Sequence, residues 1–241
     1  MYIVFLVILL IPFVVMFVIN ALEKKPEGVV VSEKEQCKMY VESVAFLWGT
    51  ALAVFIMCFI GKISLEELGF RPISFKYNIW FTVITLVLNG FLLIYSISML
   101  ILPFINPKSV EKSAAASHEG TTGVLPRTKK ERWFYSLLAF SAGICEEIVF
   151  RGFLVFLLIA IFPSAPIYLV ILISTVIFGV LHAYQGVQGI IFTGFLGLLF
   201  MCFVLVTDSL ILAILLHSLF DFSSTFILSK KNMLDSKTAI Q

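Results

Sequence analysis

Seven long apolar stretches, separated by polar connections, dominate the pattern of this sequence. They lie at about residues 2–22, 40–60, 79–105, 133–162, 167–183, 187–206 and 209–228. Because a helix rises about 1.5 Å per residue, roughly 20 apolar residues cross the ~30 Å hydrocarbon core of a bilayer. The pattern therefore predicts an all-α fold, a polytopic membrane bundle of about seven transmembrane helices, with eight as the alternative count.

Composition narrows the class of protein further. Hydrophobic residues make up 60% of the 241 residues and charged residues only 13%, which excludes a soluble globular domain. A net charge of +2 gives no basis for a nucleic-acid partner. The apolar composition makes membrane lipids the expected surroundings. The first stretch lacks a basic segment before it and a small-x-small cleavage site after it, which favours a retained helix over a signal peptide.

The positive charges of the connections predict the orientation of the bundle. If seven segments cross the membrane, alternate connections share a side, and one side carries 13 Lys or Arg residues whereas the other carries three. Loops rich in Lys and Arg stay in the cytoplasm. We therefore expect the N-terminus outside and the C-terminus in the cytoplasm, with the plasma membrane as the expected location.

One long polar connection, 107–132, divides the chain. It separates three leading helices in 1–106 from a four-helix core in 133–228, and a polar tail occupies 229–241. On the orientation above, this basic connection is cytoplasmic. Its centre is rich in small polar residues, so His118 is interpreted as a solvated loop residue.

The fourth apolar stretch carries three ionisable residues within six positions: Glu146, Glu147 and Arg151. A charge at the bilayer centre costs at least ~3 kcal/mol on insertion scales, so these residues need a physical reason. Glu147 and Arg151 are four apart, share a helix face and can neutralise each other. Glu146 points about 100° away from Glu147 and is left without a local partner.

Two other apolar stretches bring polar side chains to membrane depth. His182 closes the fifth stretch, and His217 and Asp221 lie four apart on one face of the seventh. A structural alternative exists for each piece, namely a helix-to-helix hydrogen bond or a neutralising ion pair. Interhelical hydrogen bonds in membranes are worth only about 0.6 kcal/mol on average, so the combination favours a functional site.

Carboxylates and imidazoles together are suited to activating water. Glu146 can act as a general base, and His182 can share the water or receive its proton. His217 and Asp221 can stabilise the oxyanion of a tetrahedral intermediate, or bind a metal that does so. The sequence has no His-Glu-x-x-His signature and no nucleophile elbow, so an acyl-enzyme route is not expected.

Three ordered motifs on successive helices resemble a known family. They are Glu146-Glu147-x-x-x-Arg151, Phe178-x-x-x-His182 and His217-x-x-x-Asp221. The set is similar to the CPBP family, the type II CAAX prenyl endoproteases and bacteriocin-processing enzymes, also called the Abi family. The resemblance covers roughly residues 138–226, and the segment 65–71 is similar to a piece often found ahead of this core.

The resemblance implies an α-helical intramembrane endopeptidase whose cavity opens to the cytosol. It implies six catalytic residues, which are Glu146, Glu147, Arg151, His182, His217 and Asp221. Glu146 would activate water with help from His182, and Arg151 would brace the second carboxylate of the first motif. The third motif takes Asn or Asp at its last place, and the charge of Asp221 slightly favours an orienting or metal-binding role over donation to the oxyanion.

The resemblance leaves open whether the enzyme is glutamate-dependent or a metalloendopeptidase. Two carboxylates and two histidines have the chemistry of zinc ligands. If zinc is used, its candidate ligands are Glu146, His182 and His217. No motif spacing in the sequence decides between the two mechanisms.

Three functions compete for these residues. The first is a membrane endopeptidase that acts near the cytosolic face on a peptide or protein substrate, either a prenylated C-terminus or a leader peptide. The second is a non-catalytic protein for bacteriocin immunity or scaffolding, which binds a peptide through the same polar groups. The third is a proton-coupled transporter, which the lack of inverted repeats in the sequence disfavours.

Overall fold

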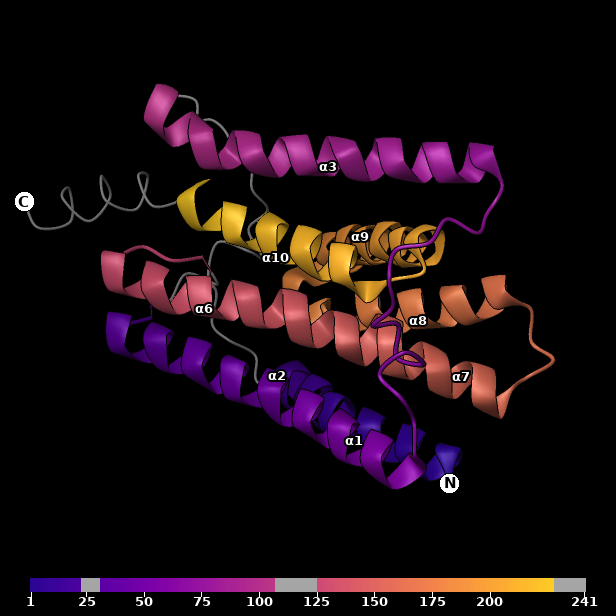
Figure 1. Ribbon diagram of the computed structural model, residues 1–241. Coiled ribbons are helices and arrows are strands. Elements are labelled where there is room, and N and C mark those ends of the chain that lie inside the picture. Colours follow the sequence, from indigo (N-terminus) through magenta and orange to yellow (C-terminus); the bar gives the residue numbers. More distant parts are fainter. Residues whose placement is uncertain (23–30, 107–124, 228–241) are drawn as a thin grey trace, which may run out of the picture.

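The computed structural model describes residues 1–22, 31–106 and 125–227, and every regular element within those ranges is a helix (Figure 1). In chain order the elements are α1 (Tyr2–Leu22), α2 (Glu33–Gly61), α3 (Ile79–Ile105), α6 (Lys129–Glu146), η1 (Glu147–Leu154), α7 (Val155–Ile161), α8 (Ile167–Leu181), η2 (Ala183–Gln185), α9 (Gly186–Thr207) and α10 (Leu210–Ile227). This confirms the all-α membrane bundle that the apolar pattern predicts. His118 and the tail from residue 228 onward lie outside the described residues.

Capping explains why two helices begin earlier than their apolar stretches. Before α2, the Ser32 side chain accepts a hydrogen bond from the Glu35 backbone, and the Glu35 side chain accepts one from the Ser32 backbone. Thr128 and Glu131 form the same reciprocal box before α6. Each box satisfies two backbone donors that a helix start would otherwise leave unpaired, so both helices extend into polar sequence.

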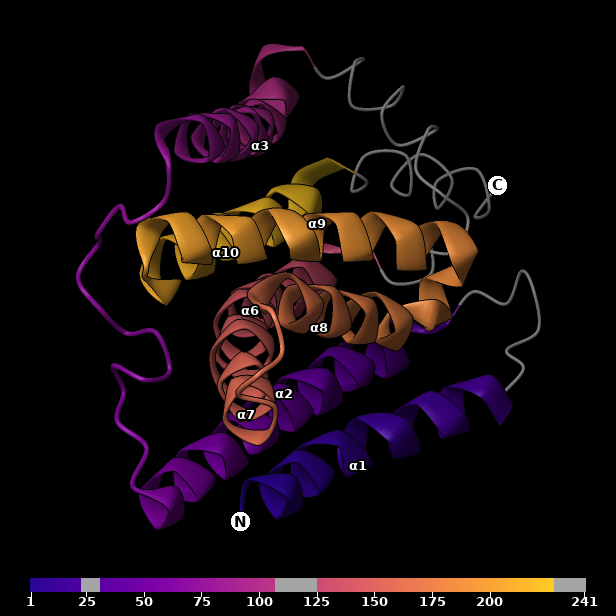
Figure 2. The same cartoon turned by 90° about the vertical axis from the view of Figure 1, so that its right-hand side faces the viewer.

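The helices are arranged in layers (Figures 1 and 2). α3 forms one outer layer and contacts α9 and α10, whereas α1 and α2 form the opposite one, with α2 packed on α6 and α1 on α7. The continuous rod of α6, η1 and α7 lies between them together with α8, α9 and α10. The elements that carry the three motifs therefore lie between the layers of leading helices.

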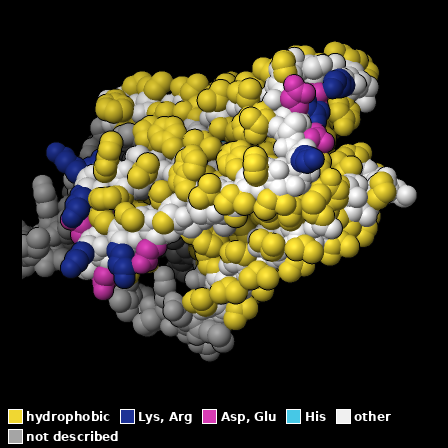
Figure 3. Space-filling model, turned by 60° about the horizontal axis from the view of Figure 1, so that its bottom comes forward, with side chains coloured by type: hydrophobic (Ala, Val, Ile, Leu, Met, Phe, Trp, Pro, Cys, Tyr) yellow, Lys and Arg dark blue, Asp and Glu magenta, His cyan; other side chains and the backbone are white. Residues whose placement is uncertain are grey.

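The surface has the character of a membrane protein. Four helices in the described part of the chain are long and apolar enough to cross a membrane, within Tyr2–Ile19, Glu33–Gly61, Ile79–Ile105 and Ala183–Thr207, and α8 and α10 contribute shorter apolar helices. Figure 3 shows hydrophobic side chains over the middle of the molecule and charged side chains gathered at two ends. Such an apolar band between charged ends suits a protein embedded in lipid. The count of seven spans and the orientation stay predictions.

A π-helical segment interrupts the long rod. All eight residues of η1 are buried, and they include Glu147 and Arg151 of the first motif. In a π-helical turn each backbone hydrogen bond spans one residue more than in an α-helix. Where the two patterns meet, some carbonyl groups are left without a backbone partner. One such carbonyl, that of Phe150, accepts a hydrogen bond from the Ser174 hydroxyl of α8 at 3.1 Å. The irregular backbone of the motif is thus supported by its neighbour.

Close packing of α6 against α10 depends on Gly143. A Cβ atom built at this position would lie 2.5 Å from the Ser218 backbone nitrogen and 2.6 Å from the Ser218 Cα. The glycine therefore lets the two helix backbones approach beside His217, which is the neighbour of Ser218 in the chain.

Gly143→Ala should lower the free energy of unfolding by about 1–3 kcal/mol, because the added methyl group must push α10 away from α6. Gly90→Ala in α3 is the matched control, since a Cβ there meets nothing within 4 Å and alanine is the better helix former. Thermal denaturation of the full chain in detergent measures both variants. An unchanged melting temperature for Gly143→Ala would contradict the close approach.

Candidate active site

A buried ion cluster joins the first and third motifs. Oε1 of Glu147 lies 2.8 Å from Nδ1 of His217 and 3.1 Å from Nη1 of Arg151. The contact with Arg151 has the distance of an ion pair without hydrogen-bond geometry. All three side chains are at least 94% buried. Because an ionised carboxylate only accepts hydrogen bonds, the His217 ring donates from Nδ1, and Glu147 fixes its orientation.

The second ring nitrogen of His217 faces two carboxylates. Nε2 lies 3.5 Å from Oδ2 of Asp221 and 3.9 Å from Oε2 of Glu146. The Asp221 and Glu146 side chains are 29% and 16% exposed, whereas that of His217 is only 6% exposed. The helical spacing correctly predicts that Asp221 contacts His217, but Glu147 holds Nδ1 of the ring, and Asp221 lies at Nε2.

His182 lies beside this cluster and is linked to it through an aromatic ring. The Phe178 ring is 4.8 Å from the His182 ring and 6.5 Å from the His217 ring, between centroids. Arg151 places its Cζ 4.0 Å from the same Phe178 centroid. His182 Nδ1 is 2.8 Å from the Phe178 carbonyl oxygen, which leaves Nε2 for other partners.

The structure therefore brings five of the six predicted residues into one connected set and places the sixth next to it. The five are Glu146, Glu147, Arg151, His217 and Asp221. Their catalytic roles stay predictions, because proximity does not assign a role.

Two further residues shape the site without having been predicted. Phe200 of α9 stacks on the His217 ring, with centroids 4.7 Å apart and planes 24° apart. At Gly197, one turn earlier, a Cβ would lie 2.8 Å from the Phe178 ring and 3.0 Å from Nη2 of Arg151. No sequence signal separates Phe200 from the other phenylalanines. Phe178, in contrast, belongs to the second motif and lies on the same helix face as His182, so its position near the site could be expected from the sequence.

The arrangement of the candidate zinc ligands can be compared with what a metal site requires. In the three ranges that the structure describes, no group of three or more His, Cys, Asp or Glu side chains is arranged to hold a metal ion. Of the candidate zinc ligands, Glu146 and His217 are neighbours, whereas His182 packs against the Phe178 ring. The residues as arranged do not fit a three-ligand zinc site, and the zinc expectation stays a prediction.

A helical membrane bundle that encloses carboxylates and imidazoles has the equipment of an intramembrane hydrolase. Residues 128–223 match the family model of the type II CAAX prenyl endopeptidases, Rce1-like, and this segment contains all three motifs. The match confirms the resemblance carried by the motifs, and this segment is similar to the CAAX-type intramembrane proteases. No curated protein and no solved structure matches the chain.

Proposed function

We propose that this protein hydrolyses a peptide bond in a prenylated C-terminus or a leader peptide, near the cytosolic membrane face, with water activated by Glu146. The observation that carries the proposal is the placement of His217, whose Nδ1 is held by Glu147 while its Nε2 faces Glu146. This arrangement supplies a general base and an oriented imidazole to the same small space. It also joins motifs that lie about seventy residues apart in the chain.

The proposed chemistry uses side chains of this chain only. The Glu146 carboxylate takes a proton from water while the water oxygen bonds to the scissile carbonyl carbon. When it carries a proton on Nε2, His217 donates to the carbonyl oxygen as that oxygen gains negative charge. The tetrahedral intermediate then collapses, the carbon–nitrogen bond breaks, and the leaving amine takes the proton from Glu146. The products are a free carboxyl group and a free amine.

Glu147 and Arg151 act as positioning residues in this proposal. Neither is exposed to substrate, since their side chains are 0% and 2% exposed. Glu147 holds the His217 ring, and Arg151 compensates the buried charge of Glu147. Asp221, which is partly exposed, is proposed to face the substrate beside Nε2 of His217.

The charges of the connections support the cytosolic face. The basic residues that predict the cytoplasmic side precede α6 and follow α10. α8 runs back along the α6–α7 rod, so His182 at its end lies toward the end of the bundle where α6 begins. A substrate chain attached to a lipid in the cytosolic leaflet would then approach from the side on which His182 lies.

His182→Ala should reduce cleavage by about 10²-fold or more, because the substitution removes the imidazole that is proposed to share the water. His118→Ala is the matched control, since His118 lies in the long polar connection and outside the segment that matches the family. Initial rates on a farnesylated CAAX peptide, with full-length protein in liposomes, measure both. Equal rates for the two variants would exclude His182 from the reaction.

A substrate panel separates the finer alternatives. Farnesylated CAAX peptides, the same peptides without the lipid, and leader peptides are offered to the wild-type chain. Preference for the farnesylated peptide supports a CAAX substrate, preference for a leader peptide supports the second substrate class, and binding without cleavage favours the scaffold reading. Loss of cleavage with a zinc chelator, restored by added zinc, would support a metalloendopeptidase.

A further inference from the structure

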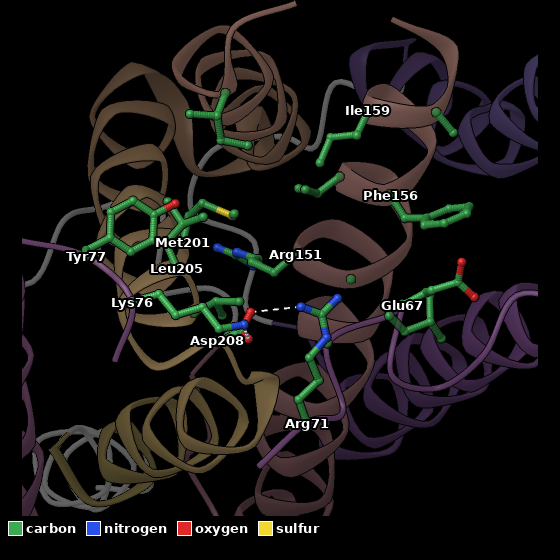
Figure 4. Close-up of a pocket in the computed structure, with 17 residues that line it drawn as sticks. Glu67, Arg71, Lys76, Tyr77, Arg151, Phe156, Ile159, Met201, Leu205 and Asp208 are labelled. Atoms are coloured by element: carbon green, nitrogen blue, oxygen red, sulfur yellow. Dashed lines mark hydrogen bonds and ion pairs between the residues drawn. The ribbon is translucent and has the colours of Figure 1, made fainter. Parts of the chain in front are cut away.

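A cavity that is lined by only one of the predicted catalytic residues, Arg151, lies at the end of the bundle where α2 and α9 end (Figure 4). Its volume is about 520 Å³, which is within the usual range of small-molecule sites. The start of α9, next to His182, is roughly 30 Å from its end at the cavity, at about 1.5 Å per residue. A ligand in this cavity would therefore bind at the opposite end of α9 from His182.

Basic side chains gather on one side of the cavity. Arg71 contacts Oδ1 of Asp208 at 2.8 Å, and Lys76 contacts the other oxygen of the same carboxylate. One negative charge is thus shared by two positive ones, which leaves an excess of positive charge. The Arg71 and Lys76 side chains are also 39% and 61% exposed, so both can reach a ligand.

The other acidic lining residue is turned to a different partner. Oε2 of Glu67 accepts hydrogen bonds from the Ser64 backbone nitrogen at 2.7 Å and the Ser64 hydroxyl at 2.9 Å. These bonds, the backbone one first, hold the pKa of Glu67 below its usual range. Figure 4 shows the Glu67 carboxylate pointing away from Arg71 and Asp208. It therefore does not neutralise the basic side of the cavity.

A third cation lines the cavity from inside the bundle. Arg151 reaches toward it from η1 (Figure 4), and its side chain is only 2% exposed. Neither Nη1 nor Nη2 of this guanidinium has a hydrogen-bond partner, although Nη1 keeps its ion contact with Glu147. Both nitrogens are enclosed and the charge is balanced by Glu147, so Arg151 forms part of the cavity wall without offering a donor to a ligand.

The remaining wall of the cavity is apolar. It consists of side chains from α7, α8 and α9, among them Phe156, Ile159, Ile167 and Met201. Ile159 and Ile167 are 46% and 41% exposed, so this wall continues onto the lipid-facing surface of the bundle. A ligand that suits both walls has an anionic head and an apolar chain.

We propose that this cavity binds a membrane phospholipid with an anionic headgroup, whose phosphate lies beside Arg71 and Lys76 and whose acyl chain lies along the α7–α9 wall. A phospholipid is the occupant that the observations favour, because the cavity is lined both by charged residues of the loops and by exposed apolar residues of α7 and α8. A free anion would leave the apolar wall uncovered. The proposal does not depend on the proteolytic activity.

Native mass spectrometry of the full chain in detergent tests this site, with dioleoylphosphatidylglycerol, dioleoylphosphatidylcholine and inorganic phosphate as probes. We expect saturable binding of phosphatidylglycerol, about five-fold tighter than that of phosphatidylcholine, because one excess basic group acts on the net negative headgroup. Lys76→Gln should remove that preference. Ala160→Phe, which adds bulk to the apolar wall, should weaken both lipids.

Lys62→Gln is the matched control, because Lys62 is an exposed residue near the same end of the bundle that does not line the cavity. Binding by this variant should equal that of the wild-type chain. Equal affinity for the two lipids, equal weakening by Lys62→Gln, or competition by inorganic phosphate at the same concentration as the lipid would each overturn the proposal. Lys76→Gln and Ala160→Phe alter different walls, so the two results are independent.

Discussion

Glu146→Gln is expected to reduce peptide cleavage by about 10²–10⁴-fold, the usual contribution of a general base. Glutamine keeps the size and the hydrogen-bonding reach of the side chain but cannot take a proton from water at neutral pH. Glu146 is the partly exposed carboxylate of the first motif and faces Nε2 of His217, so its replacement removes the proposed base and leaves the contact between Glu147 and His217 intact. Single-turnover rates on a farnesylated CAAX peptide measure the effect.

Two controls make this result specific to the site. Glu42→Gln alters a carboxylate that is 61% exposed and paired with Lys38 on the surface, so it should leave the rate unchanged. The binding affinity of Glu146→Gln for the same peptide should also stay close to wild type, because the change acts on the reaction step. Full activity of Glu146→Gln in a folded protein would contradict the proposed mechanism and favour a non-catalytic role for the protein.

Local spacing predicts part of this site well. The Glu147–Arg151 and His217–Asp221 pairs follow from residues four apart on a helix, and the structure confirms both contacts. The apolar stretches also give the helices, because burial in lipid requires long uninterrupted segments. Such inferences succeed because they depend only on helical periodicity and on the hydrophobic length of each stretch.

Contacts between distant segments could not be read from periodicity. The hydrogen bond between Glu147 and His217 depends on how η1 packs against α10, and Phe200 covers the ring only because α9 crosses there. The π-helical backbone of η1 likewise depends on support from Ser174 of α8. Asp208 contacts Arg71, which lies more than a hundred residues away in the sequence, so no local sequence pattern could predict the cavity beside them.

Glu147→Leu is expected to have the largest effect on stability, a loss of about 3–5 kcal/mol in the free energy of unfolding. The substitution leaves the Arg151 guanidinium buried without its carboxylate. It should also reduce cleavage by about 10²-fold, because an imidazole that has lost its orienting acceptor no longer holds Nε2 in place. Thermal denaturation in detergent and cleavage rates measured below the melting temperature report the two effects separately.

A second substitution distinguishes positioning from simple charge balance. Glu147→Leu combined with Arg151→Met removes both buried charges, so most of the lost stability should return. Cleavage should stay low, because His217 still lacks an acceptor at Nδ1. Glu147→Gln should regain part of the activity, since its side-chain carbonyl can accept the same hydrogen bond. If the double variant recovered wild-type cleavage, the only function of Glu147 would be to neutralise Arg151, and the orientation of His217 would have to come from its aromatic neighbours.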